Sequence, residues 1–236
     1  MSEAGVSIEP LSESALLIRV GEGLDLATSA RVHAAANALH AAGLPGVVDI
    51  VPAYATLAIH FDPLAWLDAN GGPPLPHVAS AVRAILDAPP TVSIDERDIV
   101  DIPVCYGGAH GPDLEALAQH ACLDADEVVA RHATALYRVA MLGFAPGFPY
   151  LLGLDPALAM PRRASPRTRV PAGSVAIGGV QTGIYPAALP GGWQLIGRTP
   201  LVLFDARRDP PSFVMPGDRV RFVPIAADEF DERANA

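Results

Sequence analysis

Residues 174–186 read "SVAIGGVQTGIYP", two short strand signals on either side of a turn. In each signal, apolar and β-branched residues run for a few positions and stop at Gly, Pro or a polar residue, as strands of all-β folds commonly do. The pattern recurs toward the end of the chain, so from residue 143 onward it predicts a β-barrel or β-sandwich. Its further members are "GGWQLIGRTP" (191–200), "LVLFD" (201–205) and "DRVRFVP" (218–224).

Before residue 107, strand and helix signals alternate instead. They are a strand at 14–20, an alanine-rich helix at 26–43 closed by Gly43, strand signals within 47–61, a Pro/Gly-rich loop at 70–76, a helix at 77–88 and a strand at 97–106. This order predicts a small open-faced α+β domain. Two helix-like segments follow, 111–123 and 124–142, which Asp113 and Asp124 are placed to cap.

The predicted fold class is therefore α+β. We expect an N-terminal α/β sandwich domain over residues 1–100 and a C-terminal β-barrel domain over residues 101–236, with the two helices at its start. The charge distribution supports two domains with different surroundings. Residues 1–137 hold 5 Arg against 18 Asp and Glu, residues 138–236 hold 11 Arg against 8, and all seven His precede residue 138.

Composition excludes several classes of function. The chain contains no lysine, so a P-loop lysine, a Schiff-base lysine and a biotin attached to this chain are impossible. A pI near 5.0 and the lack of a basic run interleaved with aromatic residues argue against nucleic acid as a partner. No apolar run is long enough to span a membrane, and no signal peptide is evident, so we expect a soluble cytoplasmic protein.

Cysteine and histidine usage narrows the chemistry further. Cys105 and Cys122 have neither a disulfide framework nor zinc-type spacing, so we interpret both as buried free thiols and predict no metal site. The β-rich part after residue 138 holds no His and no Cys, so it offers no His-based general base and no Cys nucleophile. We assign no catalytic residue.

The stretch "GFAPGFPYL" (143–151) places two Gly, two Pro and two Phe in nine residues. Glycine permits positive φ and proline fixes φ, so the stretch predicts a loop of defined shape. Its aromatic residues line a cleft in one interpretation and fill a core in the other. The pattern alone does not choose between them.

Four long motifs resemble one family, which joins the B subunit of 5-oxoprolinase, Kip-type kinase inhibitors and allophanate hydrolase subunit 1. The motifs are "GFAPGFPYLLGL" (143–154), "PRRASPRTRVPAGSVAIGGVQTGIYP" (161–186), "PGGWQLIGRTP" (190–200) and "PGDRVRFVPI" (216–225), and "IPVCYGGAHGPDLEALA" (102–118) extends the resemblance. The resemblance implies an N-terminal α+β domain and a cyclophilin-like C-terminal barrel. It also implies a hetero-oligomer in which this chain and the A and C subunits of 5-oxoprolinase open 5-oxo-L-proline to L-glutamate with ATP. Which chain binds ATP is left open.

Candidate binding residues lie in these motifs. Arginine holds carboxylates and phosphates through two parallel hydrogen bonds, and aromatic rings offer apolar faces to a small-molecule substrate. Arg162, Arg163, Arg207 and Arg208 are better interpreted as a solvated basic face. The predicted cleft consists of Phe144, Pro146, Phe148, Tyr150, Arg167, Arg169, Gln181, Tyr185, Trp193 and Arg198.

Three hypotheses about function remain open. The first is an enzyme subunit that contributes arginines and aromatic residues to a site shared with the C subunit, and is inactive alone. The second is a Kip-type protein that inhibits a sensor histidine kinase and catalyses nothing. The third is a carboxyltransferase-like subunit, of the allophanate hydrolase or urea carboxylase type, that acts with a biotin-bearing chain.

Overall fold

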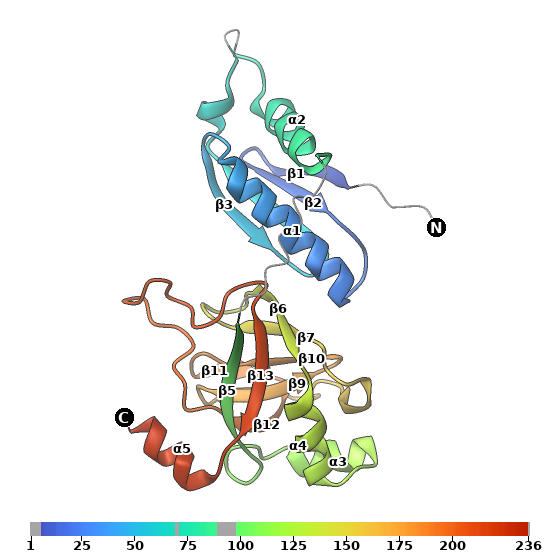
Figure 1. Cartoon of the computed structure of the whole chain (residues 1–236), viewed down its shortest axis with the longest axis vertical. Helices are drawn as coiled ribbons and strands as arrows, with labels where there is room; N and C mark the ends of the chain where they lie inside the picture. Colours follow the sequence, from blue (N-terminus) through green and yellow to red (C-terminus); the bar gives the residue numbers. More distant parts are fainter. Residues whose placement is uncertain (1–5, 69–70, 89–97, 236) are drawn as a thin grey trace. The chain divides into compact units, whose positions relative to one another are not determined.

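The computed structural model describes residues 6–68, 71–88 and 98–235. The chain divides into two compact units, residues 1–96 and 97–236, each with its own hydrophobic core (Figure 1). Helices and strands occur in both, so the predicted α+β class is confirmed. None of the helices in the described ranges is long and apolar enough to cross a membrane.

The N-terminal unit is a four-stranded antiparallel sheet in the order β1-β2-β4-β3. Helices α1 and α2 pack on it through a shared core, in which Val32 of α1 and Val78 of α2 meet Ile18 and Ile59 of the sheet. The elements are β1 (Ser7–Ser12), β2 (Ala15–Arg19), α1 (Leu26–Ala42), β3 (Val47–Pro52), β4 (Thr56–Phe61), the 3₁₀ helix η1 (Pro63–Trp66) and α2 (Pro74–Leu86).

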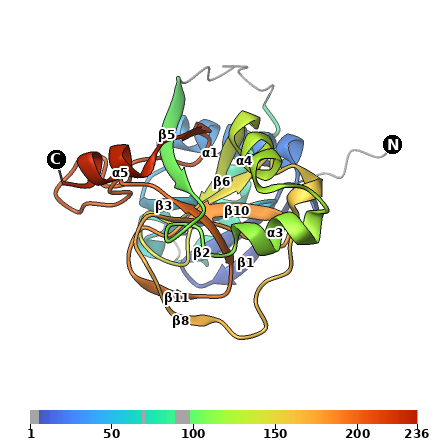
Figure 2. The same ribbon diagram turned by 90° about the horizontal axis from the view of Figure 1, so that it is seen from below.

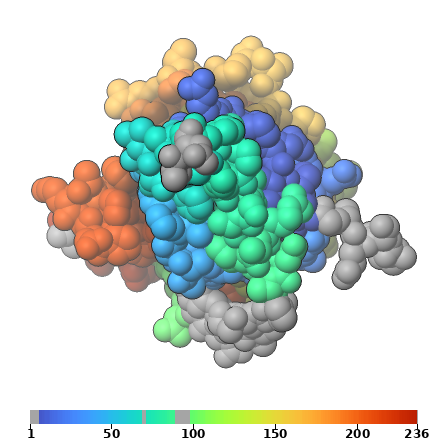
Figure 3. Space-filling view, turned by 90° about the horizontal axis from the view of Figure 1, so that it is seen from above, coloured from blue at the N-terminus to red at the C-terminus, as the bar shows by residue number. Residues whose placement is uncertain are grey.

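Local signals set the ends of α1. The Asp25 side chain accepts a hydrogen bond from the Thr28 N–H at 2.8 Å, and Gly43 ends the helix at a φ of 56°. Helix α2 begins at Pro74, earlier than predicted, because proline is favoured in the first turn of a helix. Residue 70, the first residue of the loop predicted over 70–76, lies outside the described residues. Figure 3 shows η1 and α2 side by side on the surface of this unit.

The C-terminal unit is a closed seven-stranded barrel in the order β10-β7-β6-β13-β5-β12-β9. A two-stranded ribbon, β8 with β11, lies along one side of it (Figure 2). The predicted barrel is thus confirmed, whereas its likeness to cyclophilin stays a prediction. The strands are β5 (Ile99–Tyr106), β6 (Tyr137–Leu142), β7 (Pro149–Leu152), β8 (Arg167–Val170), β9 (Ser174–Gly178), β10 (Gln181–Ile184), β11 (Leu189–Gly191), β12 (Gln194–Arg198) and β13 (Arg219–Pro224). The helices are α3 (Leu114–Ala121), α4 (Ala125–Thr134), the 3₁₀ helix η2 (Pro156–Leu158) and α5 (Ala227–Ala234).

One prediction about strand placement is wrong. The strand expected at 97–106 to complete the N-terminal sheet is β5 of the barrel, where it runs parallel to β13 and antiparallel to β12. Its residues Ile102 and Val104 are buried in the barrel core. The parallel partner β13 lies far along the chain, so the sequence around β5 gives no sign of this pairing. The alternation of strands and helices before residue 107 therefore led us to place β5 in the wrong sheet.

Three smaller predictions also need correction. The helix expected over 124–142 ends at Thr134, and β6 follows from Tyr137, because the run "YRVAML" (137–142) pairs with β7 and β13 and buries Tyr137 and Val139 in the barrel core. The region after residue 143 is not all β, since α5 lies near its end. Cys105 is buried as predicted, but Cys122 is exposed at the end of α3, with a φ of 55°.

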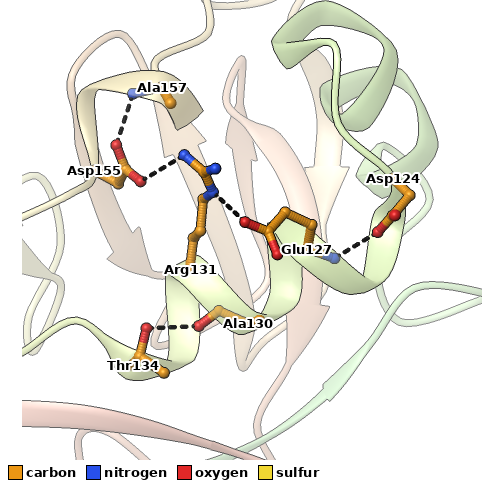
Figure 4. Close-up of polar contacts among 7 residues, drawn as sticks. All are labelled: Asp124, Glu127, Ala130, Arg131, Thr134, Asp155 and Ala157. Carbon is orange, nitrogen blue, oxygen red and sulfur yellow. Dashed lines mark hydrogen bonds and ion pairs between the residues drawn. The ribbon is translucent and has the colours of Figure 1, made fainter.

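Polar contacts lie at both ends of helix α4, and one of them joins it to η2 (Figure 4). Asp124 caps it as predicted, accepting from the Glu127 N–H at 2.7 Å. Arg131 donates to Glu127 at 2.7 Å and to Asp155 at 3.4 Å, and Asp155 in turn caps η2 through the Ala157 N–H. These contacts hold the next residue, His132, against the barrel interior.

His132 is fully buried and hydrogen-bonded through both ring nitrogens. Nδ1 lies 2.8 Å from the Tyr106 hydroxyl and Nε2 lies 3.1 Å from Oγ1 of Thr182. The Thr182 hydroxyl donates to the Ala176 carbonyl at 3.0 Å, so it accepts from Nε2–H, and Nδ1 accepts from Tyr106. The ring is therefore neutral, and burial lowers the pKa of His132 from 6.5 to about 3.

This buried ring predicts acid sensitivity. Because the folded-state pKa is lowered, the unfolded chain binds a proton first, so the free energy of unfolding falls as pH drops from 6.5 toward 3. The slope from this residue reaches about 1.4 kcal/mol per pH unit. Urea unfolding at several pH values measures it, with His132→Gln as the variant that cannot titrate. Ring chemical shifts give a second test, and a His132 signal that titrates near pH 6.5 would contradict the prediction.

Candidate functional site

Five predicted residues gather on the outside of the barrel. Phe144, Phe148, Tyr150, Tyr185 and Trp193 form a continuous group of ring contacts, which we call the aromatic shelf. The centroid of the Phe148 ring lies 4.8 Å from that of Tyr150, 5.2 Å from Tyr185 and 5.7 Å from Trp193. Phe144 meets the Phe148 ring edge-on at 5.4 Å. Edge-to-face pairs of this kind are favourable contacts, so the shelf is a packed unit.

The shelf lies on strands with very small side chains. On β9 and β10, Ile177 and Thr182 face the barrel interior, and the alternate positions face outward. A Cβ atom added to Gly178 would lie 2.6 Å from the Trp193 ring, and one added to Gly183 would lie 3.1 Å from Phe148. Gly178 in "IGG" and Gly183 in "QTG" are thus required, because the Trp193 and Phe148 rings approach them closely.

Each interpretation made from the sequence of the loop 143–148 fits one of its two phenylalanines. Phe144 adopts a φ of 65° and Gly147 a φ of 77°, which turns the chain tightly next to Phe204. Phe148 is 2% exposed and fills the centre of the shelf, whereas Phe144 is 61% exposed. One phenylalanine packs into a core and the other presents a ring to solvent.

The shelf carries two tyrosine hydroxyl groups, and arginine side chains lie beside it. The Tyr185 hydroxyl accepts the Trp193 backbone N–H, and burial raises the pKa of Tyr185. Burial also raises the pKa of Tyr150, which the nearby Arg162 partly offsets. The Arg162 guanidinium lies 5.6 Å from the centre of the Trp193 ring, and the charges of Arg162 and Arg167 both act on Tyr185. The shelf is therefore flanked by positive charge.

Asp113 positions one of these arginines, a role that its sequence context did not reveal. We predicted that it caps α3, but its side chain makes no capping hydrogen bond. It is buried, and it accepts instead from the Leu195 N–H at 2.7 Å, from Arg167 at 2.7 Å and from Arg163 at 3.4 Å. Within the described residues, Nη1 of Arg167 is buried and has no hydrogen-bond partner, so this donor is left unsatisfied inside the protein.

The other predicted residues fall in different places. Gln181 is buried on β10, paired with Gly178 on the outward positions of the strands. Pro146 and Arg169 are not buried, on the loop and on β8. Arg198 donates to the Ala172 carbonyl at 2.7 Å and lies 5.5 Å from the Phe230 ring of α5, so its contacts are with this helix rather than with the shelf.

The barrel unit includes reactive groups that lie before its β-rich part in the sequence. The barrel unit does contain histidines and a buried cysteine, His110, His120, His132 and Cys105, because it begins at β5 rather than after residue 138. Both ring nitrogens of His132 are hydrogen-bonded inside the barrel, and the His110 ring packs against Phe230. Over residues 6–68, 71–88 and 98–235, no three His, Cys, Asp or Glu side chains gather as a metal-binding set. The ligand-binding cleft itself stays a prediction.

Fold and shelf together define a two-unit α+β protein whose barrel carries an aromatic face flanked by arginines. The carboxyltransferase domain family, subdomains C and D, matches residues 6–214, and the chain belongs to this family. It is 43% identical to the B subunit of 5-oxoprolinase from Bacillus subtilis (strain 168) over 226 residues, which is 94% of each chain. It is 59% identical to the B subunit of 5-oxoprolinase from Escherichia coli O157:H7 over 129 residues, 55% of this chain and 59% of that one.

The solved structures most useful for comparison are longer chains. The crystal structure of TTHA0988 superposes with a TM-score of 0.77 at 40% identity, over 90% of this chain. This chain spans only 40% of the length of that one. The urea carboxylase of Kluyveromyces lactis, at 22% identity, superposes with a TM-score of 0.69 over 96% of this chain and 22% of its own, and shows the fold alone.

Proposed function

We propose that this chain is the B subunit of an ATP-dependent 5-oxoprolinase complex that opens 5-oxo-L-proline to L-glutamate. The observation that carries the proposal is the 43% identity to a relative of that name over 94% of both chains. In the complex, the aromatic shelf forms one wall of a composite site with the C subunit, and the enzyme is complete when the A subunit joins them.

The chemistry of the substrate fits the groups around the shelf. 5-Oxoproline is a small flat lactam that carries one carboxylate. Aromatic rings such as Phe144 offer an apolar face to the lactam ring, and the positive charges of Arg162 and Arg167 beside the shelf favour the carboxylate. The rigid packing of Phe148 beneath this face would hold it in one geometry.

The reaction also demands groups that the shelf lacks. Water must add to the lactam carbonyl carbon while the C–N bond breaks and the nitrogen gains a proton, and ATP hydrolysis supplies the driving force. In this chain the described residues of the shelf are aromatic rings, hydroxyls and permanently protonated arginines, which bind and orient better than they transfer protons. We therefore assign the acid–base groups to the partner, which is why we propose a composite site.

Exposed apolar residues support a partner chain near the shelf. Phe144, a member of the shelf, is 61% exposed, and its loop packs against Phe204 through Gly147. Large exposed apolar residues of this kind are common in interfaces between protein chains.

Reconstitution tests the proposal. We expect the purified chain alone to show no ATP-dependent hydrolysis of 5-oxoproline, and turnover to appear when the A and C subunits are added, measured as glutamate and ADP formed. Omitting each subunit in turn is the control. Turnover by this chain alone, or full turnover by the other two without it, would overturn the composite site.

The two other hypotheses predict different activities for the same purified chain. Inhibition of a sensor histidine kinase without any contribution to lactam hydrolysis would support a Kip-type regulator. Carboxyl transfer from a biotin-bearing partner would support the carboxyltransferase-like role that the family name suggests. Either result in place of 5-oxoproline turnover would reject the proposal.

A further inference from the structure

A concave pocket lies on the barrel unit beside the shelf. It has a volume of about 570 Å³, within the usual range of small-molecule sites. One side is α3, with Ala116 and His120, and the other is the segment 160–165. Arg162 lines this pocket while its guanidinium lies over Trp193, so the pocket and the aromatic shelf share a wall.

The pocket is positively charged in a chain with a formal net charge of −10. Its charged or titratable lining residues are Arg162, Arg163, His120 and Asp113. Both oxygens of Asp113 are already engaged, Oδ2 by the Leu195 N–H and Oδ1 by Arg167 and Arg163. Arg167, which is outside the lining, offsets this single carboxylate, so Arg162 and Arg163 give the pocket lining a net positive charge.

The segment that carries these arginines is held in place. The side chain of Gln194 donates to the Pro161 carbonyl at 2.9 Å, and the Arg163 N–H donates to the Gly192 carbonyl at 2.7 Å. Met160 pairs with Gly179 through two backbone hydrogen bonds. Backbone anchors therefore stand on both sides of Arg162, so a ligand need not order this segment when it binds.

We infer that this pocket binds the phosphate chain of a nucleotide. One N–H group of Arg163 already donates to Asp113, but the remaining N–H groups of the two guanidinium groups and the Ser165 hydroxyl still exceed what the two oxygens of one carboxylate can accept. A polyphosphate supplies oxygens and negative charge in that amount. The inference rests on the proposed function, in which ATP is consumed, and it places the ATP phosphates next to the shelf.

Calorimetric titration of the purified chain tests the inference without any turnover. The probes are ATP, inorganic triphosphate, adenosine and 5-oxoproline. We expect ATP and triphosphate to bind, adenosine alone not to bind, and the double variant Arg162→Ala/Arg163→Ala to lose affinity by about 10- to 100-fold. ATP binding much tighter than triphosphate would identify a nucleotide as the ligand, and equal affinities would indicate free phosphate groups and overturn the nucleotide assignment.

Matched variants distinguish binding in the pocket from a general effect of positively charged side chains elsewhere on the chain. Arg207→Ala/Arg208→Ala removes the same charge from the loop where Arg207 pairs with Asp205, outside the pocket lining, and should leave binding unchanged. Ala164→Glu adds a carboxylate to the pocket lining without touching either arginine, and should weaken binding. No binding of any phosphate probe, equal losses in both double variants, or arginine-dependent binding of 5-oxoproline alone would overturn the inference. Because these readouts need no partner chains, they can fail while reconstituted turnover succeeds, and the reverse.

Discussion

Replacing Phe148 with Ala is expected to lower the free energy of unfolding by about 3–5 kcal/mol, the usual cost of truncating a buried phenylalanine. Phe148 is 2% exposed and contacts Phe144, Tyr150, Tyr185 and Trp193, so its removal leaves a cavity in the middle of the shelf. Gly183 lies directly beneath the ring and has no side chain to fill the space. Urea unfolding of the purified chain measures the loss.

Phe144→Ala is the matched control, because it removes the same side chain from the same loop. Phe144 is 61% exposed, and Ala at its positive φ is no more strained than Phe, so stability should change by less than about 1 kcal/mol. Turnover of the reconstituted complex should nevertheless fall if the exposed ring forms a wall of the site. Equal destabilisation by the two variants would show that both rings are core, and unchanged turnover in Phe144→Ala would remove this residue from the site.

The Asp113→Ala variant is expected to be destabilised by a similar amount, about 3–5 kcal/mol, as when one partner of a buried ion pair is removed. The Asp113 side chain is 8% exposed and that of Arg167 is 23% exposed, so the guanidinium would be left without its counter-charge. The Leu195 N–H would also lose its acceptor. Asp113→Asn, which keeps an acceptor for this N–H, should recover part of the loss.

Asp101→Ala provides the comparison for this ion pair. Asp101 accepts two hydrogen bonds from Arg221, at 2.8 Å each, but both side chains are about half exposed. Water replaces the contacts of an exposed pair, so this variant should lose far less stability than Asp113→Ala. Similar unfolding curves for the two variants would show that burial of Asp113 does not govern its contribution.

Local features of the chain could be predicted well. The ends of α1 follow from Asp25 and Gly43, because a cap and a left-handed glycine act within one turn of the helix. The turn at Asp218 is equally local, since its side chain accepts the Met215 N–H three residues away. The tight path of 143–148 likewise follows from its own glycines and prolines.

Part of the candidate site was also predictable. Phe144, Phe148, Tyr150, Tyr185 and Trp193 were selected from three separate motifs, and the barrel brings all five together. Arg162 was interpreted as a solvated arginine, yet it lies over Trp193. Asp113 was interpreted as a cap, and only its closeness to Leu195 and Arg167 gives it another partner.

By itself, the sequence determined which chemistry is impossible, where α1 begins and ends and where the chain turns at 143–148, and to which family the chain is similar. Those properties depend on residue identity and on hydrogen bonds between near neighbours. The tertiary structure decided that β5 pairs with β13 in the barrel, that Arg198 meets Phe230 rather than the shelf, and that Phe148 is buried while Phe144 is exposed. Closure of the barrel joins strands distant in the chain and fixes which face each side chain takes, and no local pattern encodes that choice.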